Sequence, residues 1–321
     1  MAGARRVIVE PPVFPVDGVR ELFAGSDVAV ETRPRPWTGD DVVGLLVWQA
    51  VTEADMARLP ALRVIATGST GFDHIDTKAA ERRRIWVCNV PEYCVEEVAD
   101  STIALLLALL RGVVVLDRSV RAGVWDDHAG GPLPRISDTR LGIAGFGRIG
   151  RAVARRARGL GIETWASDPV VAAGEIAVAG VTPVSFQDLL RGCGAVTLHL
   201  PLTRDNEHLI GARELALMKP TAVLVNTSRG PVVDEAALAE ALREGRIFAA
   251  GLDVFEREPQ VHPALLACDN AVLIPHLGSA TVTTRLAMAD LAAGNLLAAL
   301  EDRRPPALLN PQAWEHRSPG G

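Results

Sequence analysis

The sequence predicts an α/β protein built on two parallel sheets. Short apolar strands alternate with helical stretches in the first third of the chain, and a second alternation begins at Leu141. Alternating strands and helices are typical of parallel sheets. Continuous apolar strands such as residues 44–47 indicate sheets that are covered on both faces. The length of 321 residues fits two domains, because domains commonly hold about 100–200 residues.

The first block is expected to hold five strands, bounded by Pro, Gly and Asp: residues 6–10, 28–31, 42–48, 64–67 and 85–89. Helices are expected between them at 19–24, 53–59 and 77–83. A long helix is predicted next, at 96–111. Glu96 and Glu97 suit the positive end of its dipole. Its body, residues 103–110, is apolar all round, which predicts burial on every side.

A loop and the second block follow this helix. Residues 123–139 are rich in Gly, Pro and Asp and have no periodicity, which predicts a long surface loop. Six strands are expected beyond it: 141–145, 163–167, 195–200, 222–226, 249–254 and 271–274. The second block is therefore expected to form a second parallel sheet.

Composition and charge exclude several classes of protein. The chain is 48% hydrophobic and 22% charged, which is ordinary for a globular protein and excludes a largely disordered one. Its net charge of −6 argues against a dedicated nucleic-acid binder. The longest apolar run, residues 103–110, is far below the ~20 residues of a membrane span. The start has no signal-peptide core. We therefore expect a soluble, cytoplasmic protein.

The cysteines and histidines do not predict a metal site. Cysteines stand at 88, 94, 193 and 268 without any C-x-x-C pair, and no two histidines have the spacing of metal ligands. This pattern predicts free thiols in a reducing compartment and no bound metal.

A glycine-rich segment predicts a dinucleotide site. Residues 145–150 match G-x-G-x-x-G, follow an apolar strand and open a helical stretch. Gly145 permits the tight turn, Gly147 lets the backbone approach a pyrophosphate, and Gly150 lets helix and strand pack closely. The helix N-terminus then stabilises the phosphate charge. Asp168 ends the next strand, where its carboxylate can accept hydrogen bonds from the ribose hydroxyls and repel a 2′-phosphate. This arrangement favours NAD over NADP.

Three further segments end predicted strands, at the sheet edge where open α/β sheets bind ligands. They carry Arg229, Glu258 and His276 in that order. Hydride transfer to a 2-oxoacid requires such a set. A guanidinium binds the substrate carboxylate, and an imidazolium donates a proton to the carbonyl oxygen. A carboxylate beside the imidazole holds its tautomer and stabilises its protonated form. Taken singly, each residue is more often a surface or loop group.

At these segments the sequence resembles the NAD-dependent D-2-hydroxyacid dehydrogenases. The resemblance runs from about residue 64 to residue 307 and rests on segments 68–73, 145–150, 199–203, 226–234, 252–259 and 275–279. Within the family, the run at 89–102 is most similar to the phosphoglycerate dehydrogenases and the C-terminal-binding corepressors; glyoxylate and hydroxypyruvate reductases belong to the same branch. The resemblance implies that Arg229, Glu258 and His276 are catalytic.

The resemblance also implies ligand contacts. For the substrate they are Ser69, Thr70, Gly71, Arg229 and His276. For the cofactor they are Gly145, Gly147, Arg148, Ile149 and Gly150 at the pyrophosphate, Asp168 at the ribose, Leu200 near the adenine, Thr227 near the nicotinamide ribose, Asp253 at the carboxamide, and His276 with Thr70 on the nicotinamide side.

The architecture implied is a Rossmann cofactor domain inserted into a flavodoxin-like substrate domain. Residues 98–282 would bind NAD, and residues 1–97 with 283–321 would bind substrate. The active site would lie in the cleft, and hinge closure would exclude water. Family members are usually dimers paired through the Rossmann domains, and residues 123–139, with Trp125 and His128, would be able to reach the partner's active site.

The departures from the family's branches narrow the function. Formate dehydrogenases carry Gln where this chain has Glu258, which argues against formate. The corepressors carry Trp where this chain has Ser279. Phe72 and residues 48–52 are expected to form the walls of the side-chain pocket. The first hypothesis is an enzyme that transfers a hydride between NAD(H) and a small 2-oxoacid or (R)-2-hydroxyacid. A non-enzymatic NAD(H)-sensing module of the corepressor type and an oxyanion dehydrogenase acting on phosphite remain alternatives.

Overall fold

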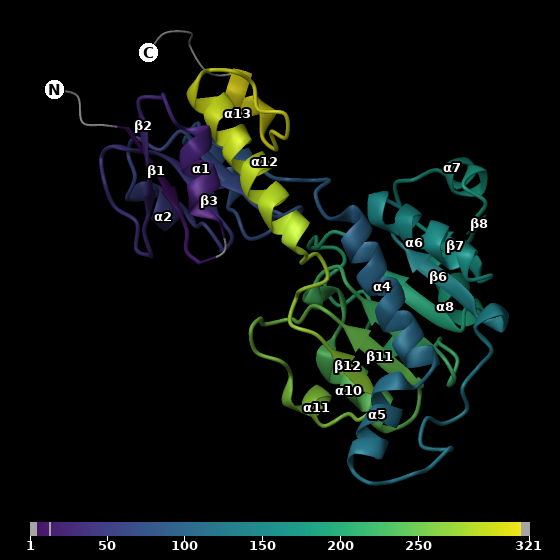
Figure 1. Ribbon diagram of the computed structural model, residues 1–321. Coiled ribbons are helices and arrows are strands. Elements are labelled where there is room, and N and C mark those ends of the chain that lie inside the picture. The colour runs from purple at the N-terminus through teal and green to yellow at the C-terminus, as the bar shows by residue number, and fades with distance from the viewer. Residues whose placement is uncertain (1–4, 13, 316–321) are drawn as a thin grey trace. The chain divides into compact units, whose positions relative to one another are not determined.

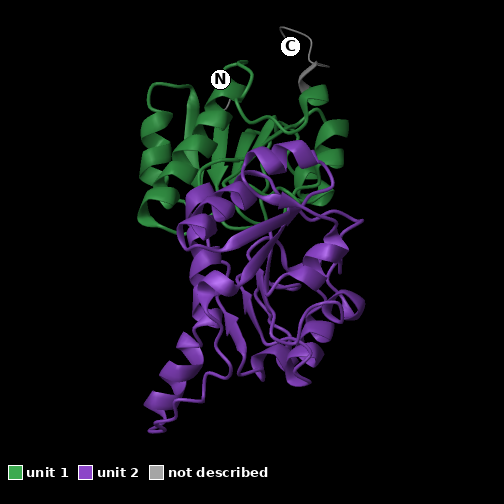
Figure 2. Cartoon of the chain, turned by 90° about the vertical axis from the view of Figure 1, so that its right-hand side faces the viewer, with its two compact units in different colours: residues 1–94, 280–321 green, residues 95–279 purple. Residues whose placement is uncertain are grey.

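The computed structural model describes residues 5–12 and 14–315 (Figure 1). The chain divides into two compact units, unit 1 of residues 1–94 with 280–321 and unit 2 of residues 95–279 (Figure 2). The sequence analysis placed the domain boundaries after 97 and after 282, whereas the two compact units are divided after 94 and after 279.

Unit 1 is built on a five-stranded sheet in the order β2-β1-β3-β4-β5, and every neighbouring pair is parallel. Its strands are β1 (Arg5–Val9), β2 (Val28–Thr32), β3 (Val42–Val47), β4 (Val64–Thr67) and β5 (Trp86–Cys88). Its helices are α1 (Val16–Leu22), α2 (Glu53–Ala57), α3 (Thr77–Arg82), α12 (Val282–Leu300) and α13 (Pro311–Glu315). Val7 and Val9 pack in the core that includes α1 and α12, whereas Ile8 packs in the core that includes α2 and α3. Helices therefore cover both faces of the sheet.

Unit 2 is built on a seven-stranded parallel sheet in the order β12-β11-β10-β9-β6-β7-β8. Its strands are β6 (Arg140–Ala144), β7 (Glu163–Ser167), β8 (Thr182–Pro183), β9 (Ala195–Leu198), β10 (Val223–Asn226), β11 (Ala249–Leu252) and β12 (Ala271–Leu273). Its α-helices are α4 (Val95–Leu110), α5 (Val113–Arg121), α6 (Arg148–Gly159), α7 (Ala173–Val178), α8 (Phe186–Gly192), α9 (Ala212–Leu215), α10 (Glu235–Arg243) and α11 (Pro263–Leu266). The strand order reverses between β6 and β9, and open α/β sheets bind ligands at the carboxyl ends of such a pair.

The long helix predicted at 96–111 is α4, but the prediction that it is buried on every side was wrong. Leu105, Leu106 and Leu109 are buried, on a helix that packs against α6, β10 and β11. Ala104, on another side of the helix, is exposed. A helix that lies on a sheet buries one stripe, so an apolar sequence alone did not show which side remains open.

Helix α5 and the edge strand β8 of unit 2 were absent from the sequence prediction, which also gave no ranges for helices α7 to α11. Helix α5 follows Gly112, whose positive φ of +60° bends the chain between the two helices. None of the α5 residues is buried, although Val114, Val115 and Leu116 are half-buried. The edge strand β8 has only two residues, which is too short to give a periodic signal.

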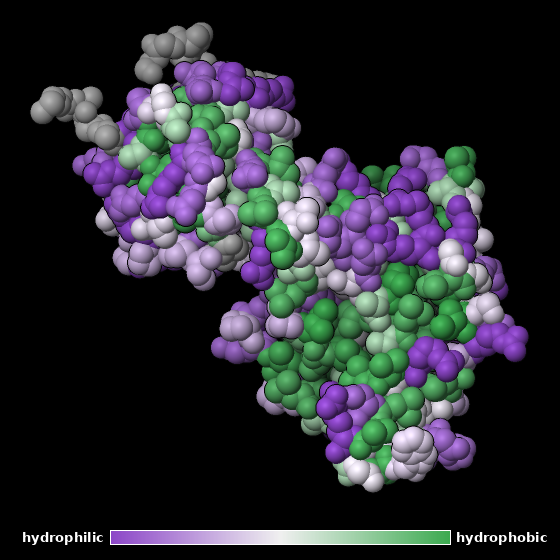
Figure 3. All heavy atoms as spheres, viewed as in Figure 1, coloured by the Kyte–Doolittle hydropathy of each residue, from purple (hydrophilic) through white to green (hydrophobic). Residues whose placement is uncertain are grey.

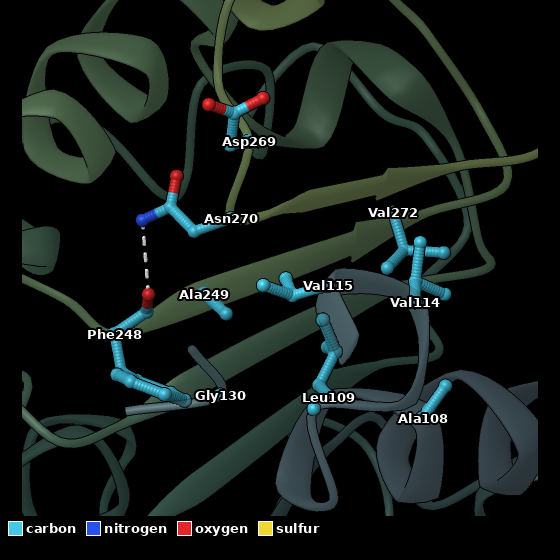
Figure 4. A pocket seen from close by; sticks show the side chains of 11 residues that line it. Ala108, Leu109, Val114, Val115, Gly130, Phe248, Ala249, Asp269, Asn270 and Val272 are labelled. Atoms are coloured by element: carbon cyan, nitrogen blue, oxygen red, sulfur yellow. Dashed lines mark hydrogen bonds between the residues drawn. The ribbon is translucent and has the colours of Figure 1, made fainter. Parts of the chain in front are cut away.

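The surface around α4 and α5 is rich in hydrophobic residues (Figure 3). Among the residues that the structure describes, no single helix is both long and apolar enough to cross a membrane; α4 and α5 pass such a test only as a pair bent by 59°. A small cavity of about 40 Å³ lies beneath α5 (Figure 4) and is lined by residues that include Leu109, Val115, Phe248 and Val272. Because Ala249 begins β11 and Phe248 directly precedes it, this cavity lies at the amino end of the sheet, away from the ligand-binding edge.

Candidate active site

The glycine-rich turn links β6 to α6 as predicted. Gly145 has a φ of +93°, and a Cβ there would lie 2.5 Å from the carbonyl oxygen of His199. A Cβ on Gly150 would collide with the carbonyl of Gly145, whereas a Cβ on Gly147 would meet no atom of the described chain within 4 Å. The turn is therefore tight on the protein side and open on the other, which fits the close approach of a pyrophosphate.

Helix α6 begins next to this open side. Gly147 is its N-cap residue, and no side chain of the described part of the chain caps it. Its first N–H groups thus remain available to an anion, as in other phosphate-binding helix N-termini. Arg148 is exposed and Ile149 is half-buried in the first turn of the helix. These positions fit the predicted cofactor contacts, which stay predictions.

Asp168 lies directly beside the turn. Its Oδ2 accepts a hydrogen bond from Phe146 N at 2.6 Å, and its Oδ1 accepts from Val170 N at 2.7 Å and Val171 N at 2.9 Å. Partial burial alone would raise the pKa of this carboxyl, but the backbone donors and the Arg151 charge outweigh that effect and lower it. An ionised carboxylate is therefore held at the end of β7.

The strand next to β6 is followed by a half-buried histidine whose two ring nitrogens are buried. His199 follows β9, and neither of its ring nitrogens has a hydrogen-bond partner in the described structure. Burial lowers the pKa of its ring to about 3, so the imidazole is neutral. Leu200 is half-buried, and its Cδ2 lies 3.1 Å from the position of a Cβ on Gly145. The segment that follows β9 therefore packs directly against the glycine turn.

Asn226, which has no exposed surface, organises the segment that carries Arg229. Its Nδ2 donates to the carbonyl of Arg229 at 2.9 Å, and its Oδ1 accepts from Ser228 N at 3.0 Å. Thr227 Oγ1 lies 2.8 Å from Thr102 Oγ1 on α4. The sequence assigned no role to Asn226, although a polar residue at the end of an apolar strand was the available signal.

Glu258 and His276 are in direct contact. Glu258 Oε2 lies 2.7 Å from His276 Nδ1, and Glu258 Oε1 accepts from Phe255 N at 3.0 Å. Burial would raise the pKa of Glu258, but the His276 hydrogen bond and charge, the Phe255 N–H and the charge of Arg229 together lower it. The carboxylate therefore occupies Nδ1 and leaves Nε2 as the ring nitrogen that can meet a substrate.

Asp253 holds the segment that follows His276. Its buried carboxylate accepts hydrogen bonds from Leu277 N at 2.8 Å and Gly278 N at 2.9 Å, and its carbonyl accepts from His276 N at 2.7 Å. Burial raises the pKa of Asp253, even though these donors lower it. Ser101 Oγ on α4 donates to the carbonyl of Gly278 at 2.8 Å. In this structure Asp253 anchors the histidine segment, and its predicted carboxamide contact remains a prediction.

The predicted carboxylate-binding loop belongs to unit 1 and follows β4. Ser69 Oγ donates to the carbonyl of Gly71 at 2.6 Å, and Thr70 Oγ1 donates to the carbonyl of Val90 at 3.1 Å. Asn89 Nδ2 donates to the carbonyl of Thr70 at 2.7 Å. These bonds use the side chains and carbonyls of the loop, whereas the N–H groups of Thr70 and Gly71 make no hydrogen bond to the described residues. A fixed loop with open N–H groups fits a bound anion.

A buried carboxylate that the sequence analysis missed supports the neighbouring loop of unit 1. Glu10 Oε2 accepts hydrogen bonds from Trp48 N at 2.9 Å and Gln49 N at 3.0 Å, and Arg35 Nε lies 3.0 Å from its Oε1. Glu10 thereby holds the segment after β3 that is expected to line the substrate pocket. A charged residue that ends an apolar strand was again the available signal.

Known proteins resemble this chain over most of its length. Residues 103–278 match the family described as "D-isomer specific 2-hydroxyacid dehydrogenase, NAD binding domain". A glyoxylate reductase from Thermococcus litoralis is 42% identical over 276 residues, which cover 84% of this chain and 83% of the relative.

Two solved structures are similar in fold. The NADPH-dependent glyoxylate/hydroxypyruvate reductase of Sinorhizobium meliloti, in complex with NADP and malonate, has a TM-score of 0.85 and 32% identity, covering 98% of this chain and 100% of its own. The D-lactate dehydrogenase of Aquifex aeolicus, in complex with NAD and lactic acid, has a TM-score of 0.81 and 27% identity, covering 92% of this chain and 95% of its own.

Proposed function

The chain belongs to the D-isomer specific 2-hydroxyacid dehydrogenase family, and we propose that it reduces a small 2-oxoacid to the (R)-2-hydroxyacid with NADH. The observation that carries this proposal is the 2.7 Å contact between Glu258 Oε2 and His276 Nδ1, with Arg229 near enough for its charge to lower the pKa of Glu258. These three groups supply an acid, its partner and a carboxylate clamp at the ligand-binding edge of the NAD-binding unit.

The proposed mechanism divides the work among these residues. When bound, the reduced nicotinamide supplies the hydride that attacks C2 of the oxoacid. The C=O π electrons move to the carbonyl oxygen, which takes a proton from Nε2 of the His276 imidazolium. Glu258 holds Nδ1 and stabilises the positive charge of the ring before transfer. Arg229 binds the substrate carboxylate through charge-assisted hydrogen bonds. In the oxidation direction His276 accepts the proton.

Asp168 supports NAD rather than NADP as the cofactor. One relative is NADPH-dependent and another was crystallised with NAD, so the family uses both. In this chain an ionised carboxylate lies beside the glycine turn, where a 2′-phosphate would be repelled. We expect kcat/KM to be higher with NADH than with NADPH, and Asp168→Ala to reduce this preference. A wild-type preference for NADPH would contradict the assignment.

We propose a substrate with a small side chain, in the class of glyoxylate and hydroxypyruvate. The relative from T. litoralis carries the name glyoxylate reductase, and its sequence aligns with 84% of this chain. The open N–H groups of Thr70 and Gly71 suit the substrate carboxylate. Trp48 and the 41%-exposed Phe72 are large groups that would limit the side chain of the oxoacid.

We also propose a homodimer paired through unit 2. In and after α5, Val113, Val120, Val124 and Trp125 expose between 52% and 91% of their surface, which is unusual for apolar residues so close in sequence. Val120→Glu should dissociate the dimer in sedimentation velocity, whereas Val178→Glu, on α7 and 91% exposed, should not. A monomeric wild-type protein would reject this pairing. The proposed dimer would also allow the loop around Trp125 to reach the partner's active site.

The experiment that tests the function is NADH oxidation by the purified protein with a series of 2-oxoacids. The series extends from glyoxylate and hydroxypyruvate to branched and aromatic side chains, with phosphite and NAD tested in the opposite direction. His276→Ala is the blank and should lower turnover by roughly 10²–10⁴-fold. Tight NADH binding without turnover of any acid would favour the sensing module, and turnover of phosphite would favour the oxyanion dehydrogenase.

A further inference from the structure

We propose that Glu235 is a positioning residue that sets the geometry of the Glu258–His276 pair by holding both ends of the loop that carries Glu258. This inference rests on the proposed function, because it assigns to Glu235 a role in the same reaction. Glu235 is the first residue of α10, and only 4% of its surface is exposed. A buried carboxylate requires hydrogen-bond donors, and their identity shows what it holds.

The donors to Glu235 are the two ends of one loop. Glu235 Oε1 accepts a hydrogen bond from Glu256 N at 2.5 Å, and Oε2 accepts from His262 N at 3.1 Å. Between these ends the loop turns back on itself, since Gln260 N donates to the carbonyl of Arg257 at 2.9 Å. A single carboxylate therefore closes the base of the loop 256–262, and Glu258 lies inside that closed loop.

The same loop is also fixed to the segment that carries Arg229. Glu256 Oε1 accepts a hydrogen bond from Glu235 N at 2.8 Å, so Glu235 and Glu256 each bind the backbone of the other. The same Glu256 oxygen lies 3.2 Å from His208 Nε2. A Cβ on Gly230 would lie 2.5 Å from Glu256 N, so the two backbones are in direct contact. The reciprocal hydrogen bonds fix the loop of Glu258 to the start of α10, and the contact at Gly230 fixes it to the segment that carries Arg229.

The position of the loop determines the position of the Glu258 carboxylate. Glu258 reaches His276 Nδ1 at 2.7 Å while it also accepts from Phe255 N at 3.0 Å, so a shift of the loop breaks one bond or the other. Misplacement of a catalytic group by about 1 Å can lower a rate by ~10²-fold. Glu235 itself bonds to backbone N–H groups and not to the reacting residues, so it acts through Glu258.

The test uses Glu235→Ala, Glu235→Gln and the double variant with Glu258→Gln, assayed with NADH and glyoxylate. Glu235→Ala should lower kcat by roughly 10–100-fold. The KM for NADH should stay within about twofold, because the glycine turn and Asp168 are unchanged. Glu235→Gln retains one acceptor oxygen, so its kcat should fall less than that of Glu235→Ala. In the double variant, removal of Glu235 should have little further effect, because the two residues act as a unit. The proposal would be overturned if the fold losses in kcat of the two single variants multiply fully in the double variant.

Asp234→Ala is the matched control. Asp234 is the N-cap of the same helix, and its Oδ1 accepts from Ala237 N at 2.9 Å. Its Oδ2 lies 4.0 Å from His208 Nδ1, so Asp234 makes no direct hydrogen bond to the loop 256–262 and reaches it only through His208. This variant should lower the melting temperature but leave kcat near the wild-type value. If it lowers kcat as much as Glu235→Ala does, damage to α10 explains both and the proposed role is wrong.

A spectroscopic readout keeps this inference separate from the proposed function. The Nδ1–H proton of His276, in its short hydrogen bond to Glu258, should give a downfield proton NMR signal that Glu258→Gln shifts upfield or abolishes. Glu235→Ala, or Glu235→Gln where the alanine variant does not fold, should weaken or move this signal. An unchanged signal would overturn the positioning role even if the wild-type protein reduces glyoxylate. Absence of turnover in the wild type, with a signal that responds to Glu235, would overturn only the proposed function.

Discussion

Replacement of Glu258 by Gln removes the negative charge beside His276 with almost no change in side-chain size. The substitution therefore tests the effect of that charge. In the native protein one carboxylate oxygen accepts from His276 Nδ1 at 2.7 Å and the other accepts from Phe255 N at 3.0 Å. An amide has only one acceptor oxygen, so its NH₂ group must face one of these two donors. The substitution therefore removes the charge that stabilises the imidazolium and also leaves one N–H without an acceptor.

The size of the effect follows from these two bonds. A hydrogen bond to a charged group contributes about 1.5–3 kcal/mol. Because about 1.4 kcal/mol corresponds to a tenfold change in rate, Glu258→Gln should lower kcat for 2-oxoacid reduction by roughly 10- to 150-fold. The KM for NADH should change little, since the cofactor-binding turn follows β6 and Asp168 follows β7, whereas Glu258 follows β11.

The assay is steady-state NADH oxidation with glyoxylate between pH 5 and pH 9. Glu81→Gln, an exposed carboxylate on α3, is the control for the loss of one negative charge and should behave as the wild type. A kcat for Glu258→Gln within twofold of the wild-type value would refute the assignment of Glu258 as the partner of the acid. A higher KM for NADH with an unchanged kcat would refute this assignment as well.

Further predictions concern the clamp, the cofactor turn, the loop contact and the thiols. Arg229→Ala should lower kcat/KM for the oxoacid by roughly 10²–10⁴-fold through two lost charge-assisted hydrogen bonds, while NADH fluorescence titration still gives near-normal binding; normal kcat/KM would place the clamp elsewhere. Since the pKa of Asp168 is lowered in the fold, its carboxylate stabilises the protein above its ordinary pKa of 3.8, and this contribution is lost as the pH falls through the lowered value. The deficit in melting temperature of Asp168→Asn should thus be present at pH 6 and shrink toward pH 2, and a deficit independent of pH would contradict this reasoning. Gly230→Ala should destabilise the protein by about 1–3 kcal/mol in urea unfolding, because its Cβ would overlap the Phe255 carbonyl; unchanged stability would mean that the two backbones separate easily. Burial raises the pKa of the Cys88 and Cys193 thiols to about 12, so both should resist thiol reagents at pH 8 until the protein unfolds, and rapid labelling of either residue in the native protein would contradict their burial.

The family and the two-sheet fold were predictable because their signals are local in sequence. The glycines at 145, 147 and 150 and the acid at 168 are constrained by one turn and the next strand end, and the structure places the turn and Asp168 in hydrogen-bond contact. The order of strands was not predictable in this way. Adjacency of β6 and β9 depends on which apolar strands pair across the sheet, and many parallel pairings satisfy the same pattern.

The residues of the site show the same distinction between signals that are local in sequence and contacts that form only in the fold. Arg229, Glu258 and His276 were predictable as candidates because each follows a strand within a recognisable segment, and their catalytic roles stay predictions. Asn226 carried only the signal of a polar residue at the end of an apolar strand, and Glu235 carried no such signal, because it binds backbone groups that any sequence would offer.

The sequence by itself determined the alternation of strands and helices, the dinucleotide turn and the types of chemical group at the strand ends, since these depend on periodicity and spacing along the chain. Only the tertiary structure decided that α4 leaves Ala104 exposed, that α5 forms after Gly112, and that Glu235 closes the loop of Glu258. These features depend on contacts between segments far apart in sequence. A buried carboxylate finds its donors, and a helix finds its buried face, only after the sheet has brought those segments together.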